Sequence, residues 1–262
     1  MIGYRIKNKN IICEMYLPNT DMHTAVIILP GLPSYIGKNL ITKTLCDAGF
    51  HVFQPFYSGS FDSKGSFTPQ NCINDVNSLI SRIKSGVFTE LRYKHKIYIR
   101  IERIVVCGIS FGASIATLIS NNSAISGLIL ISPILTYNQK IIESHSKNTS
   151  SFFQEMKGMT SYLKRAYPRS YNIIKPKYLD DFLFGRCLDP LTFLSENSHV
   201  PILILSSKND AIIPGVLIKN IIDNNLRKIG TRMKIKKGSG HGLSSFSSKS
   251  DVTDIINFIK KL

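Results

Sequence analysis

Hydrophobic and polar residues along the chain form two alternating patterns. Short runs of consecutive apolar residues, many of them β-branched, are typical of strands buried on both faces of a sheet. Between these runs, apolar residues recur every three or four positions, as on one face of an amphipathic helix. The strands predicted in this way lie at 25–31, 51–56, 103–107, 127–132, 201–207 and 231–237. Their alternation with helices predicts a mostly parallel central sheet flanked by helices, the α/β class of fold.

Capping residues mark the ends of one predicted helix. Thr68 and Pro69 form an N-cap and a first-turn proline, and Gly86 ends the helix that they begin. Residues 2–7 and 11–17 read as two strands around a Lys-Asn turn and predict an antiparallel hairpin at the start of the chain. The other predicted helices lie at 40–48, from 111 to about 121, at 214–229 and at 252–259.

Residues 134–198 interrupt this alternation. The segment places about 65 residues between two core strands, too many for a simple crossover connection. It contains ten of the 25 Phe and Tyr residues of the chain, together with several helix-like pieces. Both flanking strands belong to one sheet pattern, which disfavours a second domain. We therefore expect a single domain over residues 1–262, with 134–198 inserted as a lid over the C-terminal edge of the sheet.

Composition narrows the class of protein further. A chain of 262 residues with 43% hydrophobic residues can bury a sizeable core. It has no apolar run of ~18 residues and no N-terminal signal-peptide pattern, so we expect a cytoplasmic protein without a membrane span. The five cysteines are odd in number and form no C-x-x-C pair, and the histidines form no H-E-x-x-H pattern. We expect no disulfide scaffold, no metal and no cofactor.

The formal net charge of +16 would attract nucleic acid, anionic lipid or an anionic substrate. A compositional explanation is simpler, because Lys, Asn and Ile are abundant throughout the chain. The densest basic run, RYKHKIYIR at 92–100, alternates charged with apolar residues, as a strand or loop edge with one solvated face does. No nucleic-acid-binding motif accompanies it, so we expect no nucleic-acid partner.

Candidate chemistry begins at the turn after strand 103–107. Residues 108–112 read Gly-Ile-Ser-Phe-Gly, a G-x-S-x-G pattern that follows a buried strand and opens a helix of small residues. In that setting the tight turn lifts a serine hydroxyl above the sheet, and Gly108 and Gly112 let strand and helix approach closely. The pattern alone is common by chance, but its context favours Ser110 as a nucleophile over an ordinary strand–helix turn.

A serine hydroxyl needs an adjacent base, and the base needs an acid to orient it. His241 lies in the glycine-rich loop KKGSGHGLS after strand 231–237, and Asp210 follows strand 201–207 in SSKNDAIIP. Loops at the carboxyl ends of parallel strands are where active sites gather in open α/β sheets. Asp189 is better explained as a turn residue before Pro190. The order Ser110, Asp210, His241 is that of an α/β-hydrolase triad.

At five places the sequence resembles the α/β-hydrolases, closest to the branch with serine aminopeptidase-like and acyl esterase or thioesterase members. The segments are ILPGLPS (28–34), FYSGSFDSKGS (56–66), CGISFGAS (107–114), SSKNDAIIP (206–214) and SGHG (239–242). The resemblance implies the nucleophile, acid and base roles above. It also implies an oxyanion hole made by the backbone N–H groups of Phe111 and Leu32; Pro33 has no N–H to donate.

The predicted function is therefore serine hydrolysis of a small-molecule carboxylic ester or thioester through an acyl-enzyme on Ser110. The basic surface would suit an anionic carrier, coenzyme A or a carrier protein. A peptidase, acyltransferase or cyclase with the same triad remains an alternative; a peptidase would need a terminus anchor such as Glu143, Glu155, Asp180 or Asp181. A non-catalytic binding protein on a hydrolase scaffold is a further alternative. The sequence does not indicate an oligomeric state.

Overall fold

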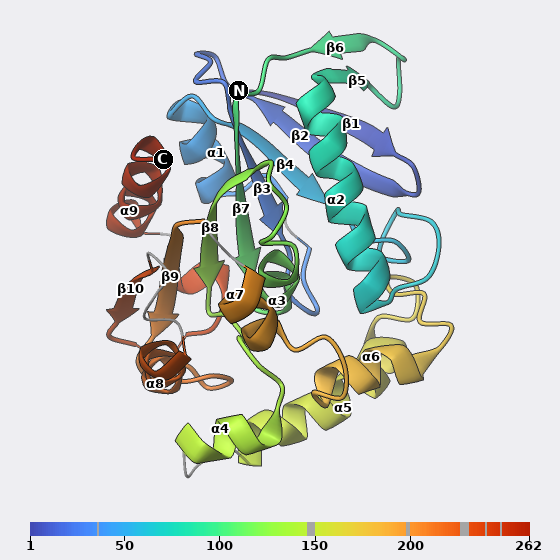
Figure 1. Ribbon diagram of the computed structural model, residues 1–262. Helices are drawn as coiled ribbons and strands as arrows, with labels where there is room; N and C mark the ends of the chain where they lie inside the picture. The colour runs from blue at the N-terminus through green and yellow to red at the C-terminus, as the bar shows by residue number, and fades with distance from the viewer. Residues whose placement is uncertain (36, 146–149, 198–199, 226–230, 239, 247) are drawn as a thin grey trace.

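The computed structural model describes residues 1–262 apart from 36, 146–149, 198–199, 226–230, 239 and 247 (Figure 1). Its centre is an eight-stranded sheet in the order β1-β2-β4-β3-β7-β8-β9-β10. These strands are β1 (Ile2–Asn8), β2 (Ile11–Leu17), β3 (Thr24–Leu29), β4 (His51–Pro55), β7 (Arg103–Ile109), β8 (Ile125–Ile131), β9 (Ile202–Ser207) and β10 (Thr231–Lys236). A separate two-stranded sheet pairs β5 (Val87–Thr89) with β6 (Lys96–Tyr98).

The sheet is mostly parallel, as the alternation of strands and helices predicts. Only β2 runs antiparallel to its neighbours β1 and β4, so the N-terminal hairpin is also confirmed. All residues of β3 and β9 are buried, because helices cover both faces of these central strands. Side chains alternate between the faces: Val26 and Ile28 join one apolar cluster, whereas Ala25 and Ile27 join the other.

Helices flank the sheet in two layers. Outside the 134–198 segment, the helices are α1 (Leu40–Asp47), α2 (Pro69–Ser85), α3 (Phe111–Leu118), α8 (Gly215–Asn225) and α9 (Lys249–Lys260). A short 3₁₀ turn, η1 (Leu243–Phe246), precedes α9. Helices α1 and α9 share the apolar cluster on one face, and α2, α3 and α8 share the cluster on the other (Figure 1). None of the described helices combines the length and the hydrophobicity that crossing a bilayer requires.

The predicted helix ends are largely confirmed. The Thr68 hydroxyl accepts a hydrogen bond from the Asn71 N–H at 3.1 Å, and Gly86 ends α2 with φ of 66°. Helix α3 ends at Leu118, before the predicted end near residue 121, because the chain tightens into i→i+3 turns in which Ser120 N–H donates to the Thr117 carbonyl. The end of the helix predicted at 214–229 lies outside the described residues.

The described part of the 134–198 segment contains four helices, α4 (Gln139–His145), α5 (Ser150–Ala166), α6 (Pro176–Leu183) and α7 (Pro190–Asn197). Helix α7 packs against α3 on the face of the sheet. Helices α5 and α6 pack against each other, and α4 packs against α8. In Figure 1, α4, α5 and α6 cross the lower end of the molecule, toward which the arrowheads of β3, β7 and β8 point. The carboxyl ends of these strands therefore face α4–α6.

The basic run at 92–100 lies at the opposite end of the molecule, in and around the β5–β6 hairpin (Figure 1). Most of its side chains are exposed, and Tyr98 is 71% exposed. This placement agrees with the expected solvated strand edge and puts the run far from the carboxyl ends of the parallel strands.

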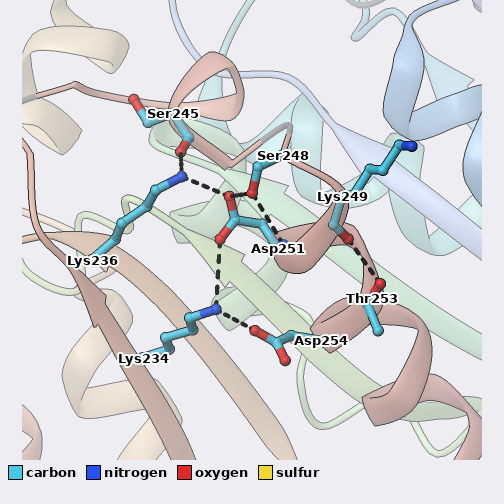
Figure 2. Close-up of polar contacts among 8 residues, drawn as sticks. All are labelled: Lys234, Lys236, Ser245, Ser248, Lys249, Asp251, Thr253 and Asp254. Atoms are coloured by element: carbon cyan, nitrogen blue, oxygen red, sulfur yellow. Dashed lines mark hydrogen bonds and ion pairs between the residues drawn. The ribbon is translucent and has the colours of Figure 1, made fainter.

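Helix α9 is joined to β10 by ion pairs that Figure 2 shows. The Asp251 carboxylate is 2% exposed and accepts a hydrogen bond from Lys236 Nζ at 2.7 Å and another from the Ser248 hydroxyl. Lys236 Nζ also donates to the Ser245 carbonyl at 3.0 Å. Lys234 lies between Asp251 and Asp254 and pairs with both. The contacts of Lys236 thus hold both β10 and the chain after residue 241 against the start of α9.

These contacts set the pKa of Asp251. Burial by itself raises the pKa, but the hydrogen bonds from Lys236 and Ser248 and the positive charges of Lys236 and Lys234 outweigh burial. The pKa of Asp251 therefore lies below its ordinary value of 3.8. A carboxyl group with a lowered pKa in the folded protein stabilises the fold above its unfolded pKa, and the contribution is lost as pH falls through the folded value.

We expect Asp251→Asn to lower the free energy of unfolding by about 1 kcal/mol near pH 7, because both lysines are more than a third exposed and solvent screens the pair. The difference from wild type should shrink as pH is lowered from about 5 toward 2. Urea unfolding followed by circular dichroism would measure both effects. Asp254→Asn, which removes a carboxylate that is 41% exposed, should change stability less. An Asp251→Asn deficit that is independent of pH would show that charge is not the cause.

Candidate active site

Ser110 lies at the turn between β7 and α3 in a strained backbone conformation. Its φ is 52° and its ψ −116°, values that non-glycine residues rarely adopt. The Ser110 N–H donates to the Ile131 carbonyl at 2.9 Å, and the Ser110 carbonyl accepts from the Ala113 N–H at 2.9 Å. Strand β8 and helix α3 therefore fix the turn from both sides and hold the side chain at the carboxyl edge of the sheet.

Two glycines make this turn possible. A Cβ at Gly108 would lie 2.4 Å from the Gly112 carbonyl oxygen, and a Cβ at Gly112 would lie 2.3 Å from the Leu29 carbonyl oxygen. Both distances are shorter than a side chain permits. The sequence-based explanation of the glycines in the G-x-S-x-G pattern, close approach of helix and strand, agrees with this packing.

The structure brings Ser110, His241 and Asp210 together. His241 Nε2 lies 2.9 Å from Ser110 Oγ. His241 Nδ1 lies 2.9 Å from Asp210 Oδ1 and 2.8 Å from Oδ2. With the carboxylate accepting from Nδ1–H, Nε2 is left as the acceptor that faces the serine hydroxyl. Ser110 is 9% exposed, the Asp210 side chain is fully buried and the His241 side chain is 25% exposed.

Backbone hydrogen bonds hold the Asp210 and His241 loops to each other. Lys208 N–H donates to the Lys236 carbonyl at 2.8 Å, and Asn209 N–H donates to the Gly238 carbonyl at 2.9 Å. The Asp210 carboxylate also accepts from the N–H groups of two residues beyond it in the same loop, at 2.9 and 3.1 Å. These hydrogen bonds hold the carboxylate independently of its contact with the imidazole, so the orientation of Asp210 does not depend on His241.

Ser132 is a residue of the site that the sequence analysis missed. It follows β8 directly, is fully buried, and has φ of 45°. Its N–H donates to the Leu205 carbonyl at 2.8 Å, and its Oγ accepts a hydrogen bond from the Gly242 N–H at 3.0 Å. The hydroxyl therefore fixes the backbone immediately after His241. The available signal was its position directly after a strand, and a serine there is too common to stand out.

Of the two predicted oxyanion-hole residues, Phe111 directly follows Ser110, and Leu32 lies in the loop after β3. Phe111 is the first residue of α3, so its N–H has no acceptor within the helix. Leu32 lines the same two cavities as Ser110 and His241. Among the described residues, neither N–H donates to a backbone acceptor. The positive end of the α3 dipole favours negative charge beside the Phe111 N–H.

Two cavities meet at Ser110, His241 and Leu32. One, of about 310 Å³, opens between the loop after β3 and the loop that carries His241; its polar edge includes Ser34, Asn39 and Ser244. The other, of about 80 Å³, lies toward α5 and α6, and its lining is mostly apolar. The candidate nucleophile therefore separates an open, partly polar space from a small apolar one.

The cysteines and the possible metal ligands of the described chain offer no second reactive centre beside Ser110. Cys107 lies three residues before Ser110, but burial raises the pKa of its thiol to about 12, so it is protonated at neutral pH. The five cysteines are free, and Cys187 is exposed. Within the described part of the chain, no group of three or more His, Cys, Asp or Glu side chains gathers in a way that would hold a metal ion.

Solved structures of esterases share this fold. The esterase EaEST from Exiguobacterium antarcticum is 17% identical with a TM-score of 0.66, and the match covers 99% of this chain and 100% of that chain. The esterase Pf2001 from Pyrococcus furiosus is 16% identical with a TM-score of 0.69, covering 99% and 90%. Est1E from Butyrivibrio proteoclasticus is 13% identical with a TM-score of 0.62, covering 99% and 96%. At these identities the likeness shows the α/β-hydrolase fold.

A comparison with curated protein sequences finds no match. A family model does match: residues 94–244 fit the family described as BAAT / Acyl-CoA thioester hydrolase C terminal. The matched range is more than half of the chain and includes Ser110, Asp210 and His241. The chain therefore belongs to the BAAT / acyl-CoA thioester hydrolase C-terminal family of α/β-hydrolases.

Proposed function

We propose that the protein is a serine hydrolase that cleaves a carboxylic ester or thioester through an acyl-enzyme on Ser110. The observation that carries the proposal is the chain of hydrogen bonds from Asp210 through His241 to Ser110 Oγ, placed where two cavities meet. A serine, a histidine and a buried carboxylate within hydrogen-bonding reach form a general arrangement for nucleophilic catalysis.

In the first half of the reaction, Ser110 Oγ attacks the carbonyl carbon while His241 Nε2 takes the hydroxyl proton. The carbonyl oxygen becomes an oxyanion, which the N–H groups of Phe111 and Leu32 stabilise. His241 then gives its proton to the leaving oxygen or sulfur as the bond to the acyl carbon breaks. The acyl group remains on Ser110 as an ester.

In the second half, His241 takes a proton from water as the water oxygen attacks the acyl-enzyme. A second oxyanion forms in the same hole and collapses as the bond between the acyl carbon and Ser110 Oγ breaks. His241 returns its proton to Oγ, and a carboxylic acid is released. The Asp210 carboxylate accepts a hydrogen bond from His241 and stabilises the imidazolium that forms in each half. Ser132 holds the His241 loop in position, because its Oγ accepts a hydrogen bond from the Gly242 N–H.

The proposed substrate class is an acyl thioester, with coenzyme A or a carrier protein as the leaving part. The description of the matched family names acyl-CoA thioesters. The chain carries a formal charge of +16, which favours approach of an anionic carrier. Helices α4, α5 and α6 are proposed as the lid over the acyl end of the site, with α7 belonging to the body because it packs on α3.

The carboxylates considered as peptide-terminus anchors are placed differently from one another. Asp181 pairs with Lys177 and Arg186, and Glu143 accepts a hydrogen bond from Gln139. Glu155 lines the small cavity beside Ser110. Of the four candidates, Glu155 alone lines a cavity at Ser110, which keeps a peptidase as an alternative. Hydrolysis of an ester or thioester is the better-supported proposal, because the description of the matched family names acyl-CoA thioesters.

Replacing Ser110 by Ala should lower kcat for an activated ester by at least about 1,000-fold, because no nucleophile remains. Intact-mass analysis after fluorophosphonate treatment should show one adduct on the wild type and none on Ser110→Ala or His241→Ala. Ser81→Ala, on the exposed face of α2, is the matched control and should keep full activity. Folded wild-type protein that neither forms an adduct nor hydrolyses any ester or thioester would support a binding protein instead.

Replacing Ser132 by Ala should lower kcat by roughly tenfold or more with little change in KM, because the His241 loop loses the acceptor for Gly242 N–H while the substrate cavities keep their lining. Steady-state kinetics of Ser132→Ala and of a control variant, Ser120→Ala, would measure kcat and KM separately. Ser120→Ala removes an equally buried hydroxyl that has no hydrogen-bond partner among the described groups, and it should leave kcat unchanged. Equal losses in the two variants would assign the effect to general destabilisation.

A further inference from the structure

The two cavities at Ser110 differ in size and in chemistry. The small cavity holds about 80 Å³ and the open one about 310 Å³. The carbonyl carbon of an ester or thioester carries the acyl chain on one side and the leaving oxygen or sulfur on the other. When that carbon lies at Ser110, the acyl part and the leaving part extend from it in two directions. The cavities offer two such directions, and each takes a different kind of group.

The small cavity is lined mostly by apolar side chains, which come from α3, α5, α6 and the loops after β3, β8 and β9. Besides Leu32, Ser110 and His241, its lining residues are Phe111, Ile134, Tyr137, Glu155, Met156, Met159, Leu183 and Ile212. Met156 and Met159 are three residues apart on α5 and therefore lie on one side of that helix. Glu155 brings the one carboxylate of this lining.

The inner wall of the small cavity is held in place by packing. The Tyr137 ring lies 4.8 Å from the Phe182 ring, and the Phe182 ring lies 5.8 Å from the Phe111 ring. The Tyr137 hydroxyl is hydrogen-bonded to Ser114 Oγ at 3.1 Å, and Tyr137 and Phe182 are buried. A close-packed wall of this kind does not expand to admit extra methylene groups without strain.

The volume sets the size of group that fits. Apolar cavities of about 150 Å³ accept a benzene-sized guest, and ordinary small-molecule sites span about 300–1,000 Å³. A space of about 80 Å³ is roughly half the benzene-sized cavity. It therefore takes about three carbons beyond the carbonyl carbon that lies at Ser110.

The open cavity fits the leaving part. It is several times larger, and the hydroxyls and carboxamide on its edge can meet the polar groups of a carrier. Tyr35, which is 56% exposed, stands at the same edge and stacks on Phe56 at a ring distance of 5.1 Å. A bulky leaving group can extend through this opening into solvent.

We propose that the small cavity is the acyl subsite and that it restricts the enzyme to uncharged short-chain acyl groups of about two to four carbons. This inference rests on the proposed function. The Met156 and Met159 side chains form the limit on chain length. The Glu155 carboxylate repels an acyl group that ends in a carboxylate of its own.

The first experiment measures kcat/KM for p-nitrophenyl esters from acetyl to dodecanoyl, with the active fraction fixed by fluorophosphonate titration. The acetyl to butyryl esters should be the best substrates, and the octanoyl ester should be at least about tenfold poorer than the butyryl ester. A preference for octanoyl or longer chains would overturn the acyl-subsite assignment and leave the serine hydrolase intact. No turnover of any ester or thioester, with no adduct, would refute the proposed function itself.

Two substitutions on α5 test the limit in opposite directions. Met156→Ala removes the thioether end from the cavity wall and should raise the octanoyl-to-butyryl ratio of kcat/KM by at least about tenfold. Met159→Phe adds volume at a partly exposed position and should lower the butyryl-to-acetyl ratio severalfold. Met22→Ala, at a 41%-exposed methionine away from the cavity, is the control and should change neither ratio. Unchanged ratios in both folded α5 variants would overturn the inference.

A pair of simple esters tests which part of the substrate enters the small cavity. Octyl acetate has a short acyl part and a long alcohol, whereas methyl octanoate has the reverse arrangement. The proposal expects octyl acetate to be cleaved at least about tenfold faster. Faster cleavage of methyl octanoate would assign the small cavity to the leaving group and overturn the proposal.

Discussion

The close approach of α3 to β3 and β7 is the constraint on which the candidate site depends. Without side chains at Gly108 and Gly112, the helix can begin directly beside the strands, and the chain between them must turn within a few residues. That turn forces Ser110 into a conformation with positive φ and raises its side chain at the edge of the sheet. Burial of the apolar residues of α3 against the sheet compensates the strain, so the same packing that stabilises the fold also positions the proposed nucleophile.

The order of strands brings the rest of the site to this turn. Ser110, Ser132, Asp210 and His241 follow β7, β8, β9 and β10, which are consecutive neighbours in the sheet and parallel to one another. Their carboxyl ends therefore form one edge, and residues up to 131 positions apart meet within hydrogen-bonding distance. The loop with His241 is restrained on both sides, by Ser132 at Gly242 and by Lys236 and Asp251 where η1 leads into α9. The imidazole is held by the surrounding sheet as much as by Asp210.

Much of this arrangement follows from the sequence alone. Buried strands are legible as apolar runs, and the glycines around Ser110 have a local steric cause, so the parallel sheet and the turn were predictable. The placement of Asp210 and His241 was predictable because each lies in the loop that follows a strand. Ser132 was not, since its role depends on an N–H donor 110 residues away and on a hydroxyl, a group too common to stand out. The cavities were not predictable either: they depend on how α5 and α6 pack over Ser110, and no local periodicity encodes that packing.

In the proposed mechanism, one part of the chain carries the catalytic groups and another part lines the acyl subsite. The sheet edge carries the groups that we propose move protons and hold the oxyanion, and their positions depend on backbone geometry that tolerates little change. The lining of the small cavity includes residues from helices of the 134–198 segment, namely Met156, Met159 and Leu183. The sequence of this segment does not have to keep the apolar strand pattern that the core requires. Substitutions there can alter the volume beside Ser110 without disturbing the hydrogen bonds of His241. This separation explains how one chemical arrangement can serve acyl groups of different size on the same fold.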